Sequence, residues 1–587
     1  MSGDTIVKPT TYGGVPPVLV DYAATAGFSW ADARRRLAPG GRLNIAAVAL
    51  DRQLELGRGD VTALRCIDRG GAVTEVSYRD LHGQACRFAN LLQGLGVGRG
   101  GRVFSLLGRV PELHVAVLGT LRQGAVFSPL FAAFGPGPVL DRLQLGRAEV
   151  VVTTDQLYRR RIKDLRGQVP TLRHVLVLDP EPDIADEVVD LRAALAAASP
   201  DHPLAPTTDE DMALLHFTSG TTGTPKGAVH VHAAVVAHHV SAASALDLRP
   251  GDTYWCTADP GWVTGISYGV IAPLTHGVTS VVDAREFDAR GWYGVLAEHG
   301  VNVWYTAPTA LRMLMRSGSE VAAEFDLSAL RHIASVGEPL NPEVVLWGQR
   351  ALGLPVHDNW WQTETGAIMI SNYRSMDIRP GSMGRPLPGV EATVLARGDD
   401  GRALVVDGAV TPVPAGELGE LALRRGWPSM FRGYLDADAR YRSAFAGDWY
   451  LTGDLARVDV DGYFWFVGRA DDVIKSAGHL IGPFEVESAL MEHGAVAEAG
   501  VIGKPDELAG ELVKAFVTVK PGVVADDALR RDLLAFGRRR LGGLAPREIE
   551  FDQHLPHTSS GKVMRRLLKA RELGLPEGDL STLEATR

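Results

Sequence analysis

The sequence predicts an α/β fold with a large N-terminal domain of mainly parallel sheets covered by helices, a β-rich subdomain and a small α+β C-terminal domain. Helix and strand patterns alternate over most of the length, which is typical of parallel sheets with covering helices. From about Gly389 the chain becomes glycine-rich, with the turn signals of antiparallel strands. A compact α+β pattern starts near Asp471. We therefore predict two domains, residues 1–470 and residues 471–587.

Individual elements of the N-terminal domain follow from local patterns. Leu81, Ala85 and Phe88 repeat at helical spacing, with Asp80 as the expected N-terminal cap and Gly94 as the end of the helix. Short β-rich runs predict strands at 150–154, 174–178, 279–282, 301–306 and 332–336, with helices such as 292–299 between several of them.

The later part of the chain carries a clear hairpin signal. Asp461-Gly462 lies between two β-rich runs, 456–460 and 463–467, and this dipeptide favours a tight turn. The C-terminal domain is expected to contain a helix near 485–492, strands at 499–502 and 514–519, and a helix from Asp526.

Composition limits the classes of function. The 587 residues include 60 Lys and Arg against 70 Asp and Glu, a net charge of −10, which disfavours broad binding to nucleic acid or an anionic membrane. Cys66, Cys86 and Cys256 are odd in number and widely spaced, so they predict neither a disulfide framework nor a zinc site. We find no signal peptide and no uninterrupted apolar span long enough to cross a bilayer. These features favour a cytoplasmic protein.

The segment from Phe217 to Gly227 is the strongest functional signal. It holds three glycines, four threonines, a serine and a lysine after an apolar run, so its backbone N–H groups can surround anionic oxygens. Lys226 adds a positive charge, and we interpret the loop as a cradle for nucleotide phosphates. It is not a Walker loop, because Lys226 precedes the glycine and Ala228 follows. A flexible surface turn is the alternative.

Further motifs follow in a fixed order: Gly337-Glu338-Pro339, Asp358 to Gly366, Thr452-Gly453-Asp454, Gly468-Arg469 and Pro556 to Lys562. Together with the loop they match the motif series of the acyl-adenylate-forming superfamily. Within it, the chain from roughly Tyr22 to Leu583 most resembles AMP-forming acetyl-CoA synthetases. The resemblance implies that ATP and acetate give acetyl-AMP and diphosphate, and that coenzyme A then takes the acetyl group and releases AMP.

The resemblance assigns roles to the motif residues. Asp454 resembles the ribose ligand, supported by Arg469, and Glu364 the ligand of Mg²⁺, which prefers carboxylate oxygen. The alternatives are that Asp454 is an ordinary turn residue, that Arg469 belongs to a surface ion pair and that Glu364 is a capping glutamate. The residues expected to bind ATP and AMP are Thr218, Ser219, Gly220, Thr221, Thr222, Gly223, Lys226, Gly337, Glu338, Pro339, Asp358, Asn359, Trp360, Trp361, Gln362, Thr363, Asp454 and Arg469.

Lys562 is the predicted catalytic residue. Its flexible ammonium can offset the negative charge that gathers at the α-phosphate and the carboxylate; a solvated lysine at a helix start is the alternative. Because Lys562 lies beyond residue 470, the small domain has to close over the nucleotide, and the resemblance places the hinge at Asp471. Acetylation would remove the charge of Lys562, so a lysine acetyltransferase and deacetylase are possible partners.

The resemblance also suggests where the acid and coenzyme A bind. Trp361 lies where a tryptophan closes the pocket of acetate-specific relatives, with Trp262, Val263, Thr264 and Val336 as further walls. Propionate is harder to exclude, since one methylene changes discrimination by only about 1–3 kcal/mol, and a core tryptophan is the alternative for Trp361. The candidates for coenzyme A are Arg142, Ala477, Gly478 and Arg538.

One position departs from the family pattern. Acetyl-CoA synthetases usually carry serine and arginine where this chain has Ala477 and Leu480, so one charge-assisted contact to the nucleotide is missing. Either a neighbour such as Lys475 or His479 substitutes for this contact, or the nucleotide is handled differently. Three alternative functions stay open: a ligase for propionate or a medium-chain acid, an enzyme that transfers the acyl group to a carrier protein, and a catalytically silent nucleotide-binding protein, of which Leu480 suggests only the last.

Overall fold

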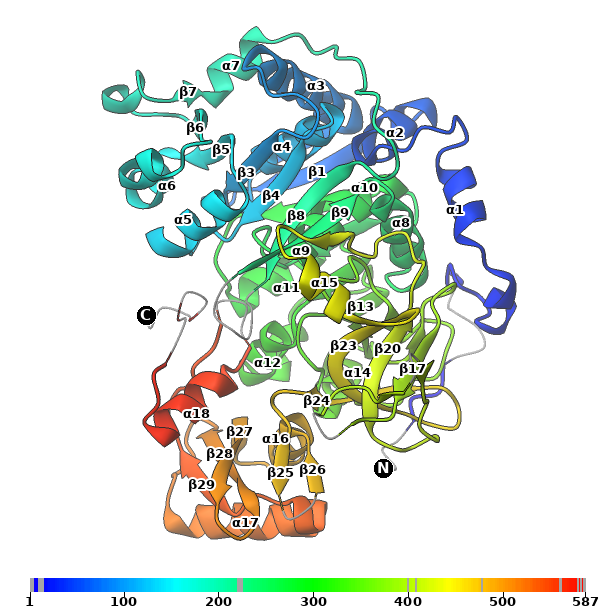
Figure 1. The fold of residues 1–587 in the computed structure, drawn as a ribbon, viewed down its shortest axis with the longest axis vertical. Helices are drawn as coiled ribbons and strands as arrows, with labels where there is room; N and C mark the ends of the chain where they lie inside the picture. Colours follow the sequence, from blue (N-terminus) through cyan, green and yellow to red (C-terminus); the bar gives the residue numbers. More distant parts are fainter. Residues whose placement is uncertain are drawn as a thin grey trace.

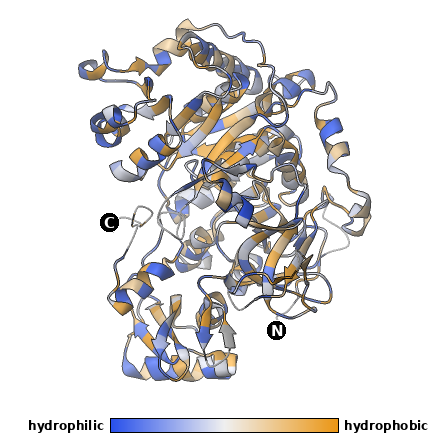
Figure 2. Ribbon diagram, viewed as in Figure 1, coloured by the Kyte–Doolittle hydropathy of each residue, from blue (hydrophilic) through white to orange (hydrophobic). Residues whose placement is uncertain are grey.

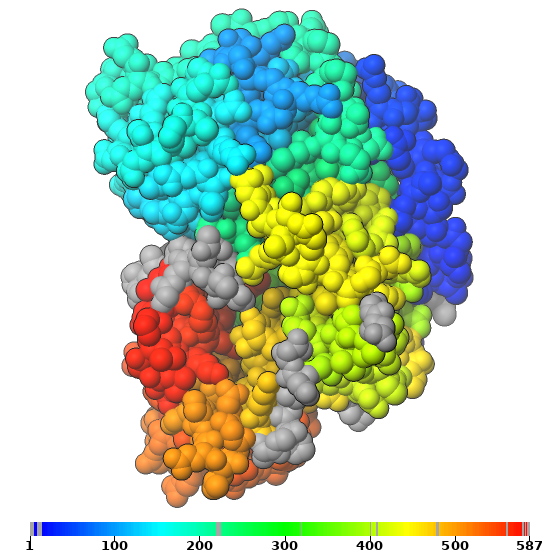
Figure 3. Space-filling view, in the orientation of Figure 1, coloured from blue at the N-terminus to red at the C-terminus, as the bar shows by residue number. Residues whose placement is uncertain are grey.

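The computed structural model describes residues 5–8, 15–218, 225–398, 401–406, 409–476, 479–558, 562–577, 580 and 583. Two large sheets form the body of the molecule, a smaller antiparallel sheet packs beside them, and the C-terminal residues form a separate lobe below (Figure 1). The space-filling view shows this lobe, in orange and red, against the underside of the body (Figure 3). The predicted α/β fold is confirmed.

The first large sheet is mostly parallel and has the strand order β21-β9-β8-β4-β3-β5-β6-β7. Only its first three strands pair in antiparallel fashion. The strands are β3 (Arg102–Leu106), β4 (Val126–Leu130), β5 (Val150–Thr154), β6 (His174–Leu178), β7 (Val189–Asp190), β8 (Met212–Thr218), β9 (Lys226–Val231) and β21 (Gly433–Tyr434).

The second large sheet has nine strands in the order β16-β15-β14-β13-β12-β10-β11-β1-β2, and its central six strands are parallel. The strands are β1 (Thr62–Ile67), β2 (Val73–Ser77), β10 (Thr253–Cys256), β11 (Thr279–Asp283), β12 (Val303–Thr306), β13 (His332–Ser335), β14 (Val356–Trp360), β15 (Ile370–Ser371) and β16 (Arg385–Pro386). The strand predicted at 301–306 begins two residues late, at Val303.

The largest hydrophobic core lies between these sheets. It joins residues of both to the helices α3 (Tyr78–Gly94), α4 (Pro111–Arg122) and α8 (Ala234–Ser244). Gly119 allows α4 to approach α3 closely, because a Cβ atom at this position would lie 2.6 Å from the Cβ of Phe88. Figure 2 shows hydrophobic residues along the strands at the centre of the body, as burial from both faces requires.

The predicted cap of α3 is wrong by three residues. Ser77, not Asp80, caps the helix: its hydroxyl accepts a hydrogen bond from the Asp80 N–H at 3.0 Å. Both residue types favour this position, so the register of the helix with its core face decides between them. The helix ends at Gly94 as predicted.

The glycine-rich region forms an antiparallel sheet of β17 (Ala392–Leu395), β20 (Gly419–Arg424), β22 (Phe445–Ala446), β23 (Trp449–Val458) and β24 (Phe464–Arg469). The Asp461-Gly462 turn joins β23 to β24 as predicted, and Gly462 has a φ of 80°, which few other residues adopt.

The C-terminal lobe has its own sheet and its own core. Its elements are β25 (Ile474–Ser476), β26 (His479–Ile481), α16 (Pro483–Met491), β27 (Val496–Asp506), β28 (Gly510–Val519), α17 (Asp527–Leu541), β29 (Glu548–Phe551) and α18 (Arg565–Leu573). The body's last strand ends at Arg469, but the exact boundary at 470 and 471 stays a prediction. Among the described residues, no helix combines the length and apolar character needed to span a bilayer.

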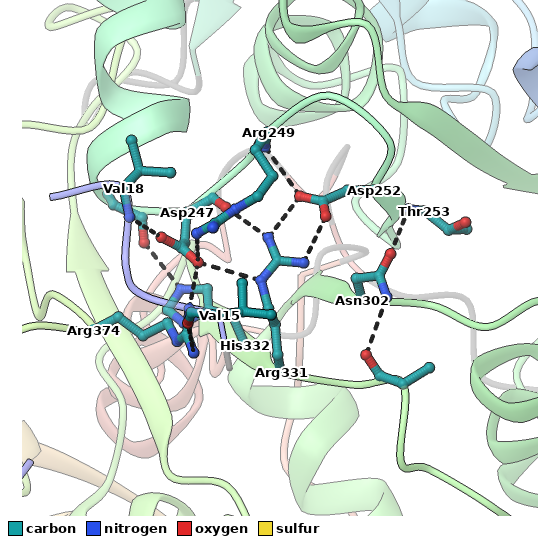
Figure 4. A network of polar contacts seen from close by, with 12 residues as sticks. Val15, Val18, Asp247, Arg249, Asp252, Thr253, Asn302, Arg331, His332 and Arg374 are labelled. Atoms are coloured by element: carbon teal, nitrogen blue, oxygen red, sulfur yellow. Dashed lines mark hydrogen bonds and ion pairs between the residues drawn. The ribbon is translucent and has the colours of Figure 1, made fainter. Parts of the chain in front are cut away.

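A buried charge network joins the N-terminal segment to the second large sheet (Figure 4). Asp247 accepts hydrogen bonds from the Val18 N–H at 2.6 Å, from Arg249 at 2.7 Å and from Arg374 at 2.8 Å. Arg331, just before β13, also pairs with it at 3.3 Å. Burial alone would raise the pKa of Asp247, but the electrostatic interaction with His332, the Val18 N–H, Arg374 and Arg249 together hold it below its usual value. The stabilisation is complete above the unfolded-state pKa of about 4 and is lost as the pH falls through the folded-state value.

We expect Asp247→Ala to destabilise the protein by about 3 kcal/mol at pH 7, the lower end for breaking a buried pair, because it leaves three half-buried arginines without their shared carboxylate. Urea and thermal unfolding would measure the loss. Asp60→Ala is the control, since Asp60 pairs with Arg79 at an exposed site, where a pair contributes about 0–1 kcal/mol. Equal losses in the two variants would contradict the structural importance of the network.

Candidate functional site

A cavity of about 1740 Å³ lies between the body and the C-terminal lobe. The ends of β8, β13, β14 and β24 open into it, together with residues 562–566 of the lobe. The sequence-predicted site residues that line it are Thr218, Lys226, Trp262, Val263, Thr264, Val336, Gly337, Glu338, Pro339, Asp358, Asn359, Trp360, Trp361, Gln362, Thr363, Glu364, Asp454, Arg469, Asp471 and Lys562.

The tip of the predicted phosphate loop, Ser219, Gly220, Thr221, Thr222 and Gly223, lies outside the described residues, as do Ala477 and Gly478. The ends of this loop are well defined: Thr218 closes β8, Lys226 opens β9, and the two residues are register partners of an antiparallel pair. The segment therefore joins two strands at the mouth of the cavity, unlike a Walker loop, which leads from a strand into a helix.

Asp454 is the best-organised polar group in the cavity. Its carboxylate accepts hydrogen bonds from Trp360 Nε1 at 2.9 Å, Gln362 Nε2 at 2.9 Å and Arg469 Nη1 at 2.8 Å. Asp454 and Arg469 are partners across β23 and β24, so the hairpin itself sets this pair. The paired carboxylate strongly raises the pKa of Arg469 and keeps it charged. A carboxylate fixed in this way can accept hydrogen bonds from two neighbouring hydroxyl groups of a sugar.

Glu338 is held by two residues that the sequence patterns did not single out. It accepts hydrogen bonds from Thr309 Oγ1 at 2.7 Å and from Arg312 Nη2 at 2.7 Å. Both donors belong to α12 (Pro308–Arg316), which begins directly after β12. Gly337, just before Glu338, has a φ of 98°. The Gly-Glu-Pro motif thus needs its glycine for a backbone conformation that turns the glutamate toward α12.

Lys562 lies within electrostatic reach of the carboxylates of Glu338 and Asp454. Thr558 holds the backbone of Lys562, because its N–H donates to the Lys562 carbonyl at 2.7 Å and its hydroxyl accepts from the Lys562 N–H at 3.0 Å. The residue is exposed to the open space of the cavity, although many protein atoms lie around it. This partial desolvation lowers the pKa of Lys562, and the two carboxylates oppose the shift.

Glu364 lines the same cavity as Lys226. Its Oε1 accepts a hydrogen bond from the Tyr434 hydroxyl at 2.7 Å, and the Lys226 ammonium lies 5.8 Å from the centre of the Tyr434 ring. Mg²⁺ is usually held by one or two carboxylates together with substrate phosphates and water. No cluster of three potential metal-binding side chains occurs in the part of the chain that the structure describes. The Glu364 carboxylate could supply one such ligand to a magnesium ion that arrives with a nucleotide.

Aromatic residues line the predicted acyl pocket. Trp262 packs against Phe131 and Phe134, with ring centres 5.5 and 5.7 Å apart. Trp361 donates from Nε1 to the Tyr305 hydroxyl at 3.3 Å. The Trp262–Thr264 segment and Val336 lie at the same cavity, so the predicted walls are brought together.

The lobe docks on the body through polar contacts that the sequence did not predict. Asn341 Nδ2 donates to Ser488 Oγ at 3.0 Å, and Arg316 lies 3.8 Å from the carboxylate of Glu498. Within the lobe, Arg565 forms a two-pronged pair with Glu487 at 2.7 and 2.6 Å. These contacts hold the segment that carries Lys562 at the mouth of the cavity.

Two candidates for coenzyme A lie apart from this cavity. Arg142, on α5 (Pro136–Leu145), is only 4% exposed; it donates to the Pro138 carbonyl at 2.9 Å and stacks 4.3 Å from the Phe134 ring. Its burial argues against a direct contact with a phosphate in this conformation. Arg538 lies on the exposed face of α17, away from the cavity lining. Both assignments stay predictions.

Comparisons with known proteins match this architecture. Residues 50–435 match the family model of the AMP-binding enzymes, and residues 485–562 match the model of the AMP-binding enzyme C-terminal domain. The chain is 46% identical to the acetyl-coenzyme A synthetase of Bacillus subtilis over 562 residues, which cover 95% of this chain and 96% of that protein. It is 38% identical to the acetyl-coenzyme A synthetase of Methanothrix thermoacetophila, covering 93% of this chain and 85% of that protein.

Solved structures of related enzymes share the fold of this chain. The crystal structure of a Brucella canis acyl-CoA synthetase superposes with a TM-score of 0.72 at 36% identity, covering 94% of this chain and 99% of that one. An anthranilate CoA ligase in complex with anthranoyl-AMP gives a TM-score of 0.80 at 29% identity, covering 91% of this chain and 97% of that one. The chain belongs to the AMP-binding enzyme family of the acyl-adenylate-forming superfamily.

We expect Asp454→Asn to weaken AMP binding, because the variant loses the charge that strengthens hydrogen bonds to hydroxyl groups. The loss should be about 1.5–3 kcal/mol, roughly 10- to 150-fold in Kd, measured by calorimetry. Asp448→Asn, in an exposed turn before β23 and outside the cavity lining, is the control. Unchanged AMP affinity in Asp454→Asn would exclude the sugar-binding role.

Proposed function

We propose that this protein is an AMP-forming acetate–CoA ligase, which converts ATP, acetate and coenzyme A into acetyl-CoA, AMP and diphosphate. The proposal rests on one observation: Lys562 lines the same cavity as Glu338, Asp454 and Arg469. The identity of 46% to an acetyl-coenzyme A synthetase over 95% of the chain supports the choice of acid.

In the first step, a carboxylate oxygen of acetate attacks the α-phosphorus of ATP, and the bond to the bridging oxygen of diphosphate breaks. Negative charge gathers around the α-phosphate in the transition state, where fixed donors and cations stabilise it most. Lys562 supplies a mobile positive charge at this point. In the second step, the thiol of coenzyme A loses its proton, its sulfur attacks the carbonyl carbon, and AMP leaves.

Different walls of the cavity bind different parts of the nucleotide. Asp454 and Arg469 bind the ribose, the 337–339 and 358–363 segments enclose the adenine, and the loop between Thr218 and Lys226 holds the β- and γ-phosphates. Glu364 would hold Mg²⁺, which neutralises phosphate charge when bound. Trp361, Trp262 and Val336 enclose the methyl group of acetate.

The proposed reaction needs two positions of the C-terminal lobe. We assign the lobe to residues 471–587 and the hinge to Asp471, which lies 3.7 Å from the Arg469 guanidinium. Rotation would withdraw Lys562 and admit coenzyme A near Gly478, with Ala477 and Arg538 as further contacts. We also propose a cytoplasmic location and control by an acetyltransferase and a deacetylase acting on Lys562.

We expect Lys562→Ala to slow acetate-dependent ATP–diphosphate exchange by about 10²- to 10³-fold, as for other fixed donors to a transition-state charge. Protein acetylated at Lys562 should lose activity to a similar extent, because the charge is also removed. Thioester formation from added acetyl-AMP should fall much less. Lys520→Ala, an exposed lysine elsewhere on the lobe, is the control. Exchange at the parental rate in Lys562→Ala would refute the mechanism.

We expect Trp361→Gly to move the preferred acid from acetate toward longer chains, because removal of the indole opens space for additional methylene groups. Each methylene accommodated should change the ratio of kcat/KM values by about 10- to 200-fold. Exchange assays with acids of two to eight carbons would measure this shift. Parental protein that already prefers octanoate would count against acetate as the substrate.

A further inference from the structure

Two tyrosines surround the indole of Trp361, and neither belongs to a motif that the sequence singled out. Tyr268 lies on the segment after α9 (Val263–Ile266), and Tyr305 lies on β12; both are fully buried. The Tyr268 ring meets the Trp361 ring edge-on, at 5.2 Å and 71°, and meets the Tyr305 ring at 5.7 Å and 73°. The three rings form one continuous aromatic cluster, which we call the aromatic cage.

The Tyr305 hydroxyl fixes the indole through a short chain of hydrogen bonds. It accepts from Trp361 Nε1 at 3.3 Å and donates to Asn359 Oδ1 at 3.0 Å. Burial raises the pKa of Tyr305 well above its usual value, so the hydroxyl keeps its proton at all physiological pH values. The direction of both hydrogen bonds is therefore constant.

Tyr268 is itself anchored on two sides. Its hydroxyl accepts from the Ile368 N–H at 2.7 Å and lies 2.7 Å from Ser241 Oγ. Because Ser241 donates to the Ala237 carbonyl at 2.6 Å, the Tyr268 hydroxyl donates to Ser241. The ring beside Trp361 thus has no freedom to move outward.

We propose that Tyr305 and Tyr268 are specificity-determining positioning residues, which set the depth of the acyl pocket by holding the Trp361 indole in one orientation. The inference rests on the proposed function, because it concerns the acid used by that site. If the indole could move slightly away from the acyl pocket, the pocket would gain room for part of another methylene group. A fixed indole keeps propionate out, although the difference between the two acids is only one methylene group.

The test is Tyr305→Phe, which retains the ring and removes the hydroxyl that the indole contacts. The ratio of kcat/KM for acetate to that for propionate should fall at least fivefold, mainly through a lower KM for propionate, while the KM for ATP stays within twofold. Tyr268→Phe should lower the ratio in the same direction. Tyr293→Phe is the matched control, since it deletes a buried hydroxyl in a different core cluster and should leave the ratio unchanged.

A double-mutant cycle shows whether Tyr305 acts through Trp361. Trp361→Phe removes the indole N–H, so adding Tyr305→Phe to this variant should change the acid ratio by less than twofold. Additive effects would overturn the inference, as would an unchanged ratio in Tyr305→Phe or an equal loss for both acids together with weaker ATP binding. AMP affinity and thermal unfolding confirm that each variant is folded.

Failure of this inference can be distinguished from failure of the proposed function. If the parental protein shows no acid-dependent ATP–diphosphate exchange, the proposed function fails, and the aromatic cage has no acid to select. If the parental protein prefers acetate and Tyr305→Phe keeps the same preference, the ligase stands and the positioning role of Tyr305 is overturned.

Discussion

The Lys562 ammonium, carried by the C-terminal lobe, shares one cavity with two carboxylates of the body, Glu338 and Asp454. Glu338 and Asp454 belong to the body, where donors from neighbouring strands and helices hold each of them, while Thr558 of the lobe holds the backbone of the lysine. The carboxylates favour the charged amine, and partial desolvation opposes it. The electrostatics of the site therefore depend on how closely the lobe docks.

The body provides a rigid frame because its polar groups are oriented before any ligand binds. Three donors converge on Asp454, and two converge on Glu338. Side chains held in this way need little reorganisation during a reaction, which is the main source of electrostatic catalysis. At the opposite end of β13, the network around Asp247 fixes the same strand whose other end leads to Gly337. One parallel strand thus joins a stabilising network to the proposed site.

Local patterns in the sequence predicted the fold, and the resemblance to a known family predicted most of the cavity lining, but neither predicted the residues that support the site. Val336 and Trp361 follow directly on neighbouring parallel strands, whose carboxyl ends meet at one edge of a sheet. Trp361 meets Tyr305 from 56 residues away, and Arg312 reaches Glu338 from a helix without a motif, so only tertiary packing could show either contact. The same limit explains Arg142, whose burial on Phe134 no local pattern reveals.

The placement of the lysine on a separate lobe follows from the opposing demands of the two proposed half-reactions. The first gathers negative charge that an ammonium stabilises, whereas the second has to release AMP and admit a thiol to the same carbonyl carbon. A lysine fixed to the body would continue to bind the phosphate. In this structure the lobe has its own core, and it meets the body through contacts such as Asn341 with Ser488 and the partly exposed pair of Arg316 and Glu498. The Asn341–Ser488 contact is one hydrogen bond between neutral groups, which typically contributes about 0.5–1.5 kcal/mol. Contacts of this strength are compatible with the lobe movement that the proposed reaction requires.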